Sequence, residues 1–510
     1  MMKINLIEYF VETVNLYPDK TAVIEGQKSV SFKELDVRAQ SIARCIIEQT
    51  NQQCKPVAVF LPKSIDAAAS DLAITYSGNI YMNLDVKNPE ERLGNILSLI
   101  QPVAIITNNQ YESKIQNVVP ENVKIINLEA ITSAEPSDAS YFIQHLRSLI
   151  DTDPYCIINT SGSTGTPKGV VLNHKSFIDF MAQTFDEYHF TENDVIGSLS
   201  PIVFDIWSYE LCLLMGKGAS IVIIPDTLAV FPVKMLQLMQ EQKVSYIFWV
   251  PTIMVNIANM GLLDKVELPS LRVCWFAGEV FPTKQFNVWY HALPQVTFAN
   301  FYGPIEITLD CVYYTVDREI PDAEPIPIGQ AFRNTEILIL DENNQRITKA
   351  GVQGELCVRG TSLAMGYYNN PEKTLAAFVQ NPLNSHYPEI IYRTGDIVEI
   401  NERDEMVFKG RKDSLIKHQG YRIELTEIEH VIINSLKLVD NGCVVYKHDT
   451  KEIILFYESD KEINAAEFRK LIGTALPRYM VPVSYVRLEQ LQRNTNGKID
   501  RLFYNKQVNG

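Results

Sequence analysis

The segment from Thr160 to Gly169 reads TSGSTGTPKG, and it follows an apolar run, Tyr155–Ile158, that predicts a buried strand. Three glycines, five hydroxyl side chains and one lysine, Lys168, share these ten positions. Glycines let backbone N–H groups approach an anion, hydroxyls donate hydrogen bonds and lysine adds a positive charge. The spacing GxxxxGK[ST] of a Walker A loop is not satisfied. The segment therefore predicts a phosphate-binding loop of another kind.

On both sides of this loop, apolar strand-like runs alternate with amphipathic helical patterns, which predicts α/β architecture with largely parallel sheets. After about Pro327, short strands separated by turn residues predict a small β-rich subdomain. One hydrophobic core rarely exceeds about 250–300 residues. We therefore expect a large N-terminal α/β domain over 1–412 and a small α+β C-terminal domain over 413–510. The clearest predictions are strands at Pro56–Phe60, Val103–Thr107, Val123–Ile126, Ser220–Ile224 and Tyr246–Val250, and helices at Glu34–Glu48, Pro232–Gln242, Leu425–Leu436 and Ala465–Ala475.

Composition excludes several classes of function. The 510 residues carry 46 Lys plus Arg against 61 Asp plus Glu, a net charge of −15, which argues against nucleic-acid binding and suits a cytoplasmic protein. The uncharged stretch Val244–Leu263 is long enough to span a bilayer, but Pro251 and two asparagines interrupt it. We expect a buried strand and helix there and no membrane insertion. The eight cysteines and eight histidines lack the spacing of a zinc site.

Seven further motifs occur in order along nearly the whole chain. With the loop they make eight, and although one motif could arise by chance, eight in this order could not. Together with the loop they resemble the adenylate-forming enzymes, a superfamily that includes acyl-CoA synthetases, firefly luciferase and the adenylation domains of nonribosomal peptide synthetases. The motifs are SFKEL (31–35), FYGPIE (301–306), GELC (354–357), YRTGD (392–396), GRKD (410–413), GYRIE (420–424) and NGKIDR (496–501).

The resemblance implies that the chain uses ATP and Mg²⁺. Three residue types suit this use: Tyr302 offers an aromatic face to adenine, Glu306 is a hard oxygen ligand for Mg²⁺, and Asp396 can accept hydrogen bonds from ribose hydroxyls. Ile305 stands where the family usually has threonine, which removes one contact to the α-phosphate. The resemblance assigns nucleotide binding to Thr160, Ser161, Gly162, Ser163, Thr164, Gly165, Lys168, Tyr302, Gly303, Asp396, Arg411 and Lys498.

The same resemblance identifies Lys498, Lys168 and Glu306 as catalytic. Lys498 can reach the charge that develops between the substrate carboxylate and the α-phosphate. Asp413 corresponds to the hinge of the family, which implies that the small C-terminal domain is mobile.

The segment FDIWSYE (204–210) resembles that of amino-acid-activating members, in which the aspartate pairs with the substrate α-ammonium. Four of the positions expected to line the substrate pocket are aromatic, so the substrate is expected to be small: serine, alanine or glycine. The carboxyl group of Asp310 could accept a hydrogen bond from a hydroxyl group, which favours serine. The pocket positions are Asp205, Ile206, Tyr209, Phe248, Trp275, Ala277, Phe301, Leu309 and Asp310, with Lys498.

We therefore expect an amino-acid adenylating ligase that forms aminoacyl-AMP and passes the aminoacyl group to the phosphopantetheine thiol of a separate carrier protein. Two alternatives remain open: an acyl-CoA synthetase that forms a CoA thioester, and a non-catalytic nucleotide-binding homologue. The sequence contains neither a carrier attachment serine nor a condensation motif, so a free-standing, monomeric enzyme is expected. Residues 277–282, AGEVFP, are similar to D-alanine–carrier protein ligases, in which cysteine usually occupies the position of Ala277.

Overall fold

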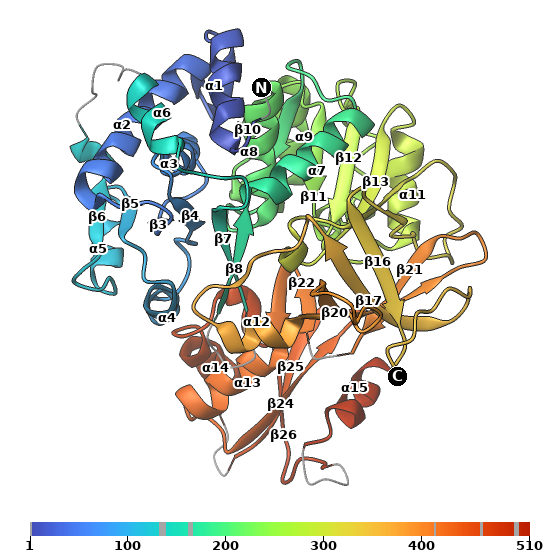
Figure 1. Cartoon of the computed structure of the whole chain (residues 1–510). Helices are drawn as coiled ribbons and strands as arrows, with labels where there is room; N and C mark the ends of the chain where they lie inside the picture. The colour runs from blue at the N-terminus through green and yellow to red at the C-terminus, as the bar shows by residue number, and fades with distance from the viewer. Residues whose placement is uncertain (1–2, 132–138, 162–166, 413–414, 460–462, 494–498) are drawn as a thin grey trace.

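The computed structural model describes residues 3–131, 139–161, 167–412, 415–459, 463–493 and 499–510 (Figure 1). Helices alternate with mostly parallel strands through the first three hundred residues, which confirms the predicted α/β class. Within the described residues, no helix combines the length and the apolar character needed to cross a membrane.

A seven-stranded sheet forms the first half of the N-terminal region, in the order β18-β8-β7-β4-β3-β5-β6. Strands β7, β4, β3, β5 and β6 are parallel, while β8 returns antiparallel to β7. The elements are α2 (Phe32–Thr50), β3 (Pro56–Val59), α3 (Ile65–Tyr76), β4 (Ile80–Asn83), α4 (Glu90–Ile100), β5 (Ala104–Thr107), α5 (Glu112–Gln116), β6 (Lys124–Asn127), α6 (Ala139–Leu146), β7 (Pro154–Thr160), β8 (Lys168–Asn173) and β18 (Gly366–Tyr367).

A nine-stranded sheet forms the second half, in the order β15-β14-β13-β12-β11-β9-β10-β1-β2. Its six central strands are parallel, and β11 followed by α10 accounts for the uncharged stretch that the sequence analysis considered as a membrane span. The elements are α1 (Leu6–Leu16), β1 (Thr21–Glu25), β2 (Lys28–Ser31), α7 (His174–Glu187), β9 (Val195–Ser198), α8 (Asp205–Lys217), β10 (Ser220–Ile223), α9 (Pro232–Glu241), β11 (Tyr246–Trp249), α10 (Pro251–Asn259), β12 (Val273–Ala277), α11 (Thr283–Ala292), β13 (Thr297–Tyr302), β14 (Val312–Thr315) and β15 (Gln330–Ala331).

Helices α3 and α8 join these two halves. Residues 206–215 of α8 are all buried, and α3 is buried over nearly its whole length. A helix that is apolar all round needs partners on every side. Accordingly, α3 contacts β3 and β4 of one sheet and β1 of the other. The carboxyl ends of β4, β7, β12 and β13 open at the same junction, and this is where ligands bind in open α/β sheets.

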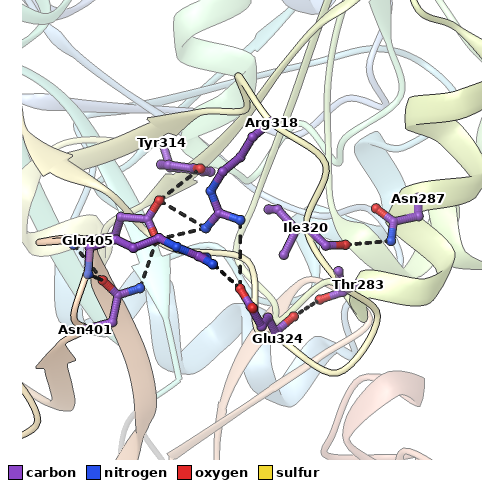
Figure 2. Close-up of polar contacts among 9 residues, drawn as sticks. Thr283, Asn287, Tyr314, Arg318, Ile320, Glu324, Asn401 and Glu405 are labelled. Atoms are coloured by element: carbon purple, nitrogen blue, oxygen red, sulfur yellow. Dashed lines mark hydrogen bonds and ion pairs between the residues drawn. The ribbon is translucent and has the colours of Figure 1, made fainter.

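A small antiparallel sheet follows, as the sequence predicts. Figure 2 shows how a polar cluster ties it to the second half: the Arg318 guanidinium donates to the Glu405 carboxylate at 3.0 Å. Arg403 also donates to Glu324 at 2.8 Å. The hydroxyl of Tyr314 donates to the same Glu405 at 3.2 Å. The elements are β16 (Thr335–Leu340), β17 (Gln353–Gly360), α12 (Pro371–Ala377), β19 (Phe378–Gln380), β20 (Ile390–Ile400) and β21 (Met406–Arg411).

The C-terminal elements, orange to red in Figure 1, form two small sheets that share no described strand with the rest. The predicted helix Leu425–Leu436 is present as α13, which continues after His430 as a π-helical turn, Val431–Ser435. The predicted helix Ala465–Ala475 was too long, because α14 stops before Gly473, a weak helix former. The elements are β22 (Leu415–His418), β23 (Tyr421–Glu424), α13 (Leu425–His430), β24 (Asn441–Lys447), β25 (Glu452–Glu458), α14 (Ala465–Ile472), β26 (Ser484–Arg487) and α15 (Arg501–Asn509).

Candidate functional site

A cavity of about 150 Å³ lies where the two halves of the N-terminal region meet the C-terminal elements. The first half contributes Asn83 and Ile158, the second half contributes Phe248, and the C-terminal elements contribute Lys417 and Arg422. A site at such a junction can contact more than one substrate, because its walls come from the two halves of the N-terminal region and from the C-terminal elements.

Six predicted substrate residues border this cavity, and Asp205 is the first residue of α8. A helix N-terminus favours a negative charge. Burial nevertheless raises the pKa of Asp205 to about 6, against the opposing effect of the backbone N–H groups of Ile206 and Leu309. A carboxylate in this setting gains most from a cationic partner that is also shielded from water. The six residues are Asp205, Ile206, Phe248, Ala277, Leu309 and Asp310.

A second carboxyl group and a lysine complete the charged wall of the cavity. Asp310 is 4% exposed, and burial together with the neighbouring Asp205 raises its pKa well above the usual range. Lys417 reaches in from β22, and burial lowers the pKa of its ammonium group. Lys417 was not among the residues predicted from the sequence, because a lysine on a short strand is ordinarily an exposed surface residue.

Three predicted pocket residues, Tyr209, Trp275 and Phe301, do not border the cavity. We expected these three side chains to line the wall of the substrate pocket, but they stack behind Phe248. The ring centroids of Trp275 and Phe301 lie 4.2 Å apart, and those of Tyr209 and Trp275 lie 5.4 Å apart. All three side chains are fully or almost fully buried. They therefore fill the space behind Phe248 and leave no opening there among the described residues that border the cavity.

A tight turn brings Leu309 and Asp310 to the cavity. Thr308 and Leu309 both have positive φ angles, +53° and +62°, which side-chain-bearing residues rarely adopt. A Cβ atom on Gly303 would lie 2.4 Å from the Cα atom of Asp310, so only glycine fits at that position. The close packing of this turn against Gly303 holds the strained backbone in place, and the turn fixes Leu309 and Asp310 at the border of the cavity.

Glu306 is fully buried and makes contacts that bear on the predicted Mg²⁺ site. The hydroxyl of Tyr367 donates to its Oε1 at 2.7 Å, and Arg422 Nη1 donates to its Oε2 at 2.5 Å. Burial alone would raise the pKa of Glu306, but Arg422 and Lys168 lower it to about 2. A charged carboxylate is the right ligand type for Mg²⁺, which commonly takes one or two carboxylates plus phosphate oxygens. Both oxygens of this carboxylate already accept a hydrogen bond, so a metal ion would compete there with Arg422.

Lys168 and Ser161, both predicted to bind the nucleotide, are also engaged by C-terminal elements. Lys168 Nζ lies 3.3 Å from Glu424 Oε1, and Ser161 Oγ donates to the carbonyl oxygen of Arg422 and accepts from the Glu424 N–H at 3.1 Å. Across the same interface, Arg92 pairs with Glu427 at 2.5 Å. The sequence identified the GYRIE motif, but the partners of its arginine and glutamate required the tertiary structure.

The predicted ribose and adenine residues lie together. The hydroxyl of Tyr302 donates to Asp396, and Arg411 forms an ion pair with the same carboxylate. Gly303 borders the cavity, as does Thr160, whose buried hydroxyl has no partner among the described residues. Six predicted positions lie outside the described residues: Gly162, Ser163, Thr164, Gly165, Asp413 and Lys498.

Comparisons with known proteins agree with this arrangement. The profile of a family described as AMP-binding enzyme matches residues 10–368. Gramicidin S synthase 1 of Brevibacillus brevis is 31% identical over 498 residues, which cover 97% of this chain and 44% of that protein. A dimodular nonribosomal peptide synthase of Bacillus subtilis (strain 168) is 31% identical over 507 residues, which cover 98% of this chain and 20% of that one. The chain thus spans less than half the length of these curated relatives.

The fold is also that of a solved structure, the Vibrio cholerae adenylation domain AlmE in complex with glycyl-adenosine-5'-phosphate. The TM-score is 0.85 at 21% identity, and the match covers 100% of this chain and 98% of the other. A likeness at this identity concerns the two-domain fold, with a large N-terminal and a smaller C-terminal part.

Proposed function

The chain belongs to the AMP-binding enzyme family, and on this premise we propose that it activates a small amino acid as aminoacyl-AMP and transfers it to a separate carrier protein. Serine, alanine and glycine are the candidate substrates, and ATP with Mg²⁺ supplies the adenylate. The observation that carries the proposal is the partly buried carboxyl group of Asp205, at the start of α8 and at the border of a small cavity.

The proposed reaction has two steps. First, a carboxylate oxygen of the amino acid attacks the α-phosphorus of ATP, a C(O)–O–P bond forms and pyrophosphate leaves. Then the phosphopantetheine thiol of the carrier attacks the carbonyl carbon, the thiol proton is lost, a thioester forms and AMP leaves. Catalysis of this kind depends on positioning and on stabilisation of charge. Asp205 would orient the α-ammonium, and Mg²⁺ at Glu306 would neutralise phosphate charge.

The contacts of the C-terminal elements support two positions of the C-terminal domain, one for each step of the proposed reaction. Arg422 neutralises Glu306 and Glu424 pairs with Lys168, so both residues proposed to meet the phosphates are already engaged. We propose that the arrangement described here serves the transfer step. Adenylation would then require the C-terminal domain to turn about Asp413, which would free Glu306 and Lys168 and allow Lys498 to act.

An ATP–pyrophosphate exchange panel over the L- and D-amino acids tests the proposal. We expect exchange with one or more of serine, alanine and glycine, and transfer of the activated residue to a phosphopantetheinylated carrier. Exchange only with acids that lack the amino group, with release of a CoA thioester, would favour an acyl-CoA synthetase. Nucleotide binding without exchange for any acid would favour a non-catalytic homologue.

Trp275 tests the proposed size limit. Trp275→Ala removes the ring that stacks on Phe301 and Tyr209, so the enzyme should activate leucine or phenylalanine, which the wild type rejects. Overpacking a filled site costs about 1–3 kcal/mol, so the expected gain for larger substrates is about tenfold or more. Trp275→Phe is the matched control, because a smaller ring still fills much of the space. A wild type that prefers a large aromatic amino acid would contradict the proposed pocket.

Asp310 tests the choice between serine and alanine. A hydrogen bond to a charged group contributes a net free energy of about 1.5–3 kcal/mol, and a hydrogen bond to a neutral group contributes less. Asp310→Ala should therefore lower kcat/KM for serine about 5- to 30-fold relative to alanine. Asp310→Asn keeps an acceptor oxygen and should lose less. If the serine-to-alanine ratio stays the same in both variants, serine loses its support and alanine or glycine becomes the better assignment.

A further inference from the structure

Asp71 is a buried carboxyl group in the middle of helix α3. It is 1% exposed, and its neighbours in the helix are mostly alanine, leucine and isoleucine. It borders no described cavity, so direct contact with a ligand does not account for it. A buried carboxyl group in such surroundings is costly unless its hydrogen bonds compensate for the lost hydration.

The hydrogen bonds of Asp71 join the two halves of the N-terminal region. Its Oδ2 accepts from the indole N–H of Trp207 on α8 at 2.8 Å, and from the amide of Asn83 at the end of β4 at 3.0 Å. Next to this contact, the Tyr81 hydroxyl donates to the Ser208 hydroxyl at 2.6 Å. Helix α8 and strand β4 are thus both tied to helix α3 at one oxygen atom.

Both tied elements form walls of the cavity. Trp207 follows Asp205 by two residues and so lies in the same first turn of α8. That turn has no side-chain cap from its N-cap residue Phe204, so contacts further along must fix it. Asn83 borders the cavity on the opposite side of the junction. The distance between these two walls therefore depends on the bonds to Asp71.

Stability alone explains this cluster poorly. Asp71 Oδ1 and Asn83 Oδ1 are both buried without a partner among the described residues. Such atoms are costly, and replacing buried polar groups with apolar ones of similar shape is often neutral or stabilising. Burial also raises the pKa of Asp71 to about 7, in keeping with its apolar surroundings.

We propose that Asp71 is a positioning residue for amino-acid binding: through Trp207 it holds the first turn of α8, and with it Asp205, at a fixed distance from β4. The inference rests on the proposed function of Asp205. It adds that the affinity for the amino acid is set in part by a carboxyl group that touches no substrate. A displacement of about 1 Å in such a site can cost up to about 10²-fold in rate.

The test compares Asp71→Leu and Trp207→Phe with the wild type by steady-state kinetics and thermal unfolding. Each variant should raise the amino-acid KM about tenfold while the ATP KM stays within about twofold. The double variant should be no worse than the more affected single one, because both remove the same link. Asp71→Leu should lower the unfolding temperature, because the buried N–H groups of Trp207 and Asn83 lose their acceptor, so the effect on KM is judged against a control variant that also loses stability. If Asp71→Leu does not fold, Trp207→Phe still tests the same hydrogen bond, because it removes the indole N–H donor.

Asp36→Leu is the matched control. Asp36 is a partly buried carboxyl group on α2 that accepts from Tyr76 and Gln40 and borders no described cavity, so its loss should lower stability without changing the amino-acid KM. The inference is overturned if Asp71→Leu and Trp207→Phe leave the amino-acid KM unchanged, or raise both KM values equally while stability falls. Absence of amino-acid-dependent exchange in the wild type would instead overturn the proposed function itself.

Discussion

Asp205→Ala is expected to raise the amino-acid KM by about 30-fold or more while the ATP KM changes little. The α-ammonium group would lose a desolvated ionic partner, and truncating one member of such a pair typically costs about 2–5 kcal/mol. The proposed nucleotide residues Tyr302 and Arg411 both contact Asp396, so they are positioned by their own contacts and ATP binding should be preserved. Pyrophosphate exchange at varied amino-acid and ATP concentrations measures both constants.

Two further variants serve as controls for this experiment. Asp205→Asn keeps the shape but not the charge and should resemble alanine, whereas Asp186→Ala, which removes an exposed carboxylate of α7, should match the wild type. An unchanged amino-acid KM, or good activity with acids that lack the amino group, would contradict the role of Asp205 and restore the acyl-CoA synthetase alternative.

The same assignment has a pH dependence. Because the pKa of Asp205 is raised to about 6, its carboxyl group is charged above that pH and becomes neutral as the pH falls through it. The neutral form cannot form the ion pair, so kcat/KM for the amino acid should fall below about pH 6. Asp205→Asn has no such proton to gain, and its profile should lose this limb.

Lys498→Ala should lower the rate of adenylate formation by about 10²-fold or more, the scale of removing one donor to a transition-state charge. Transfer from preformed aminoacyl-AMP should be less affected, because in the proposed transfer arrangement Arg422 and Lys417 face the site. Single-turnover measurements of the two steps, with pyrophosphate release and carrier loading as readouts, separate these effects.

Lys506→Ala is the control for this experiment, since Lys506 is an exposed lysine of α15 close to the same end of the chain. Equal losses in both steps would contradict the role given to Lys498 and would point to a general effect on the C-terminal domain.

The sequence by itself determined the fold class and most elements of the N-terminal region. Runs such as Pro56–Phe60 and Tyr246–Val250 are apolar throughout, because parallel strands covered on both faces have no solvent side, and β3 and β11 fall within them. The ordered motifs gave the family, and the start of α8 at Asp205 coincides with the FDIWSYE segment. These features are local, so the residues that carry them are neighbours in the chain.

The tertiary structure alone decided which side chains meet. Lys417 and Arg422 lie more than one hundred residues from Asp310 and Glu306, and only the packing of the C-terminal elements brings them together. Tyr209, Trp275 and Phe301 lie behind Phe248 and not at the cavity surface, because the packing of α8 against strands β12 and β13 stacks their rings on one another. The link from Asp71 to Trp207 joins helices α3 and α8, and the two residues lie 136 positions apart in the chain. Periodicity shows which face of an element is buried, whereas the partner on that face depends on contacts between distant segments.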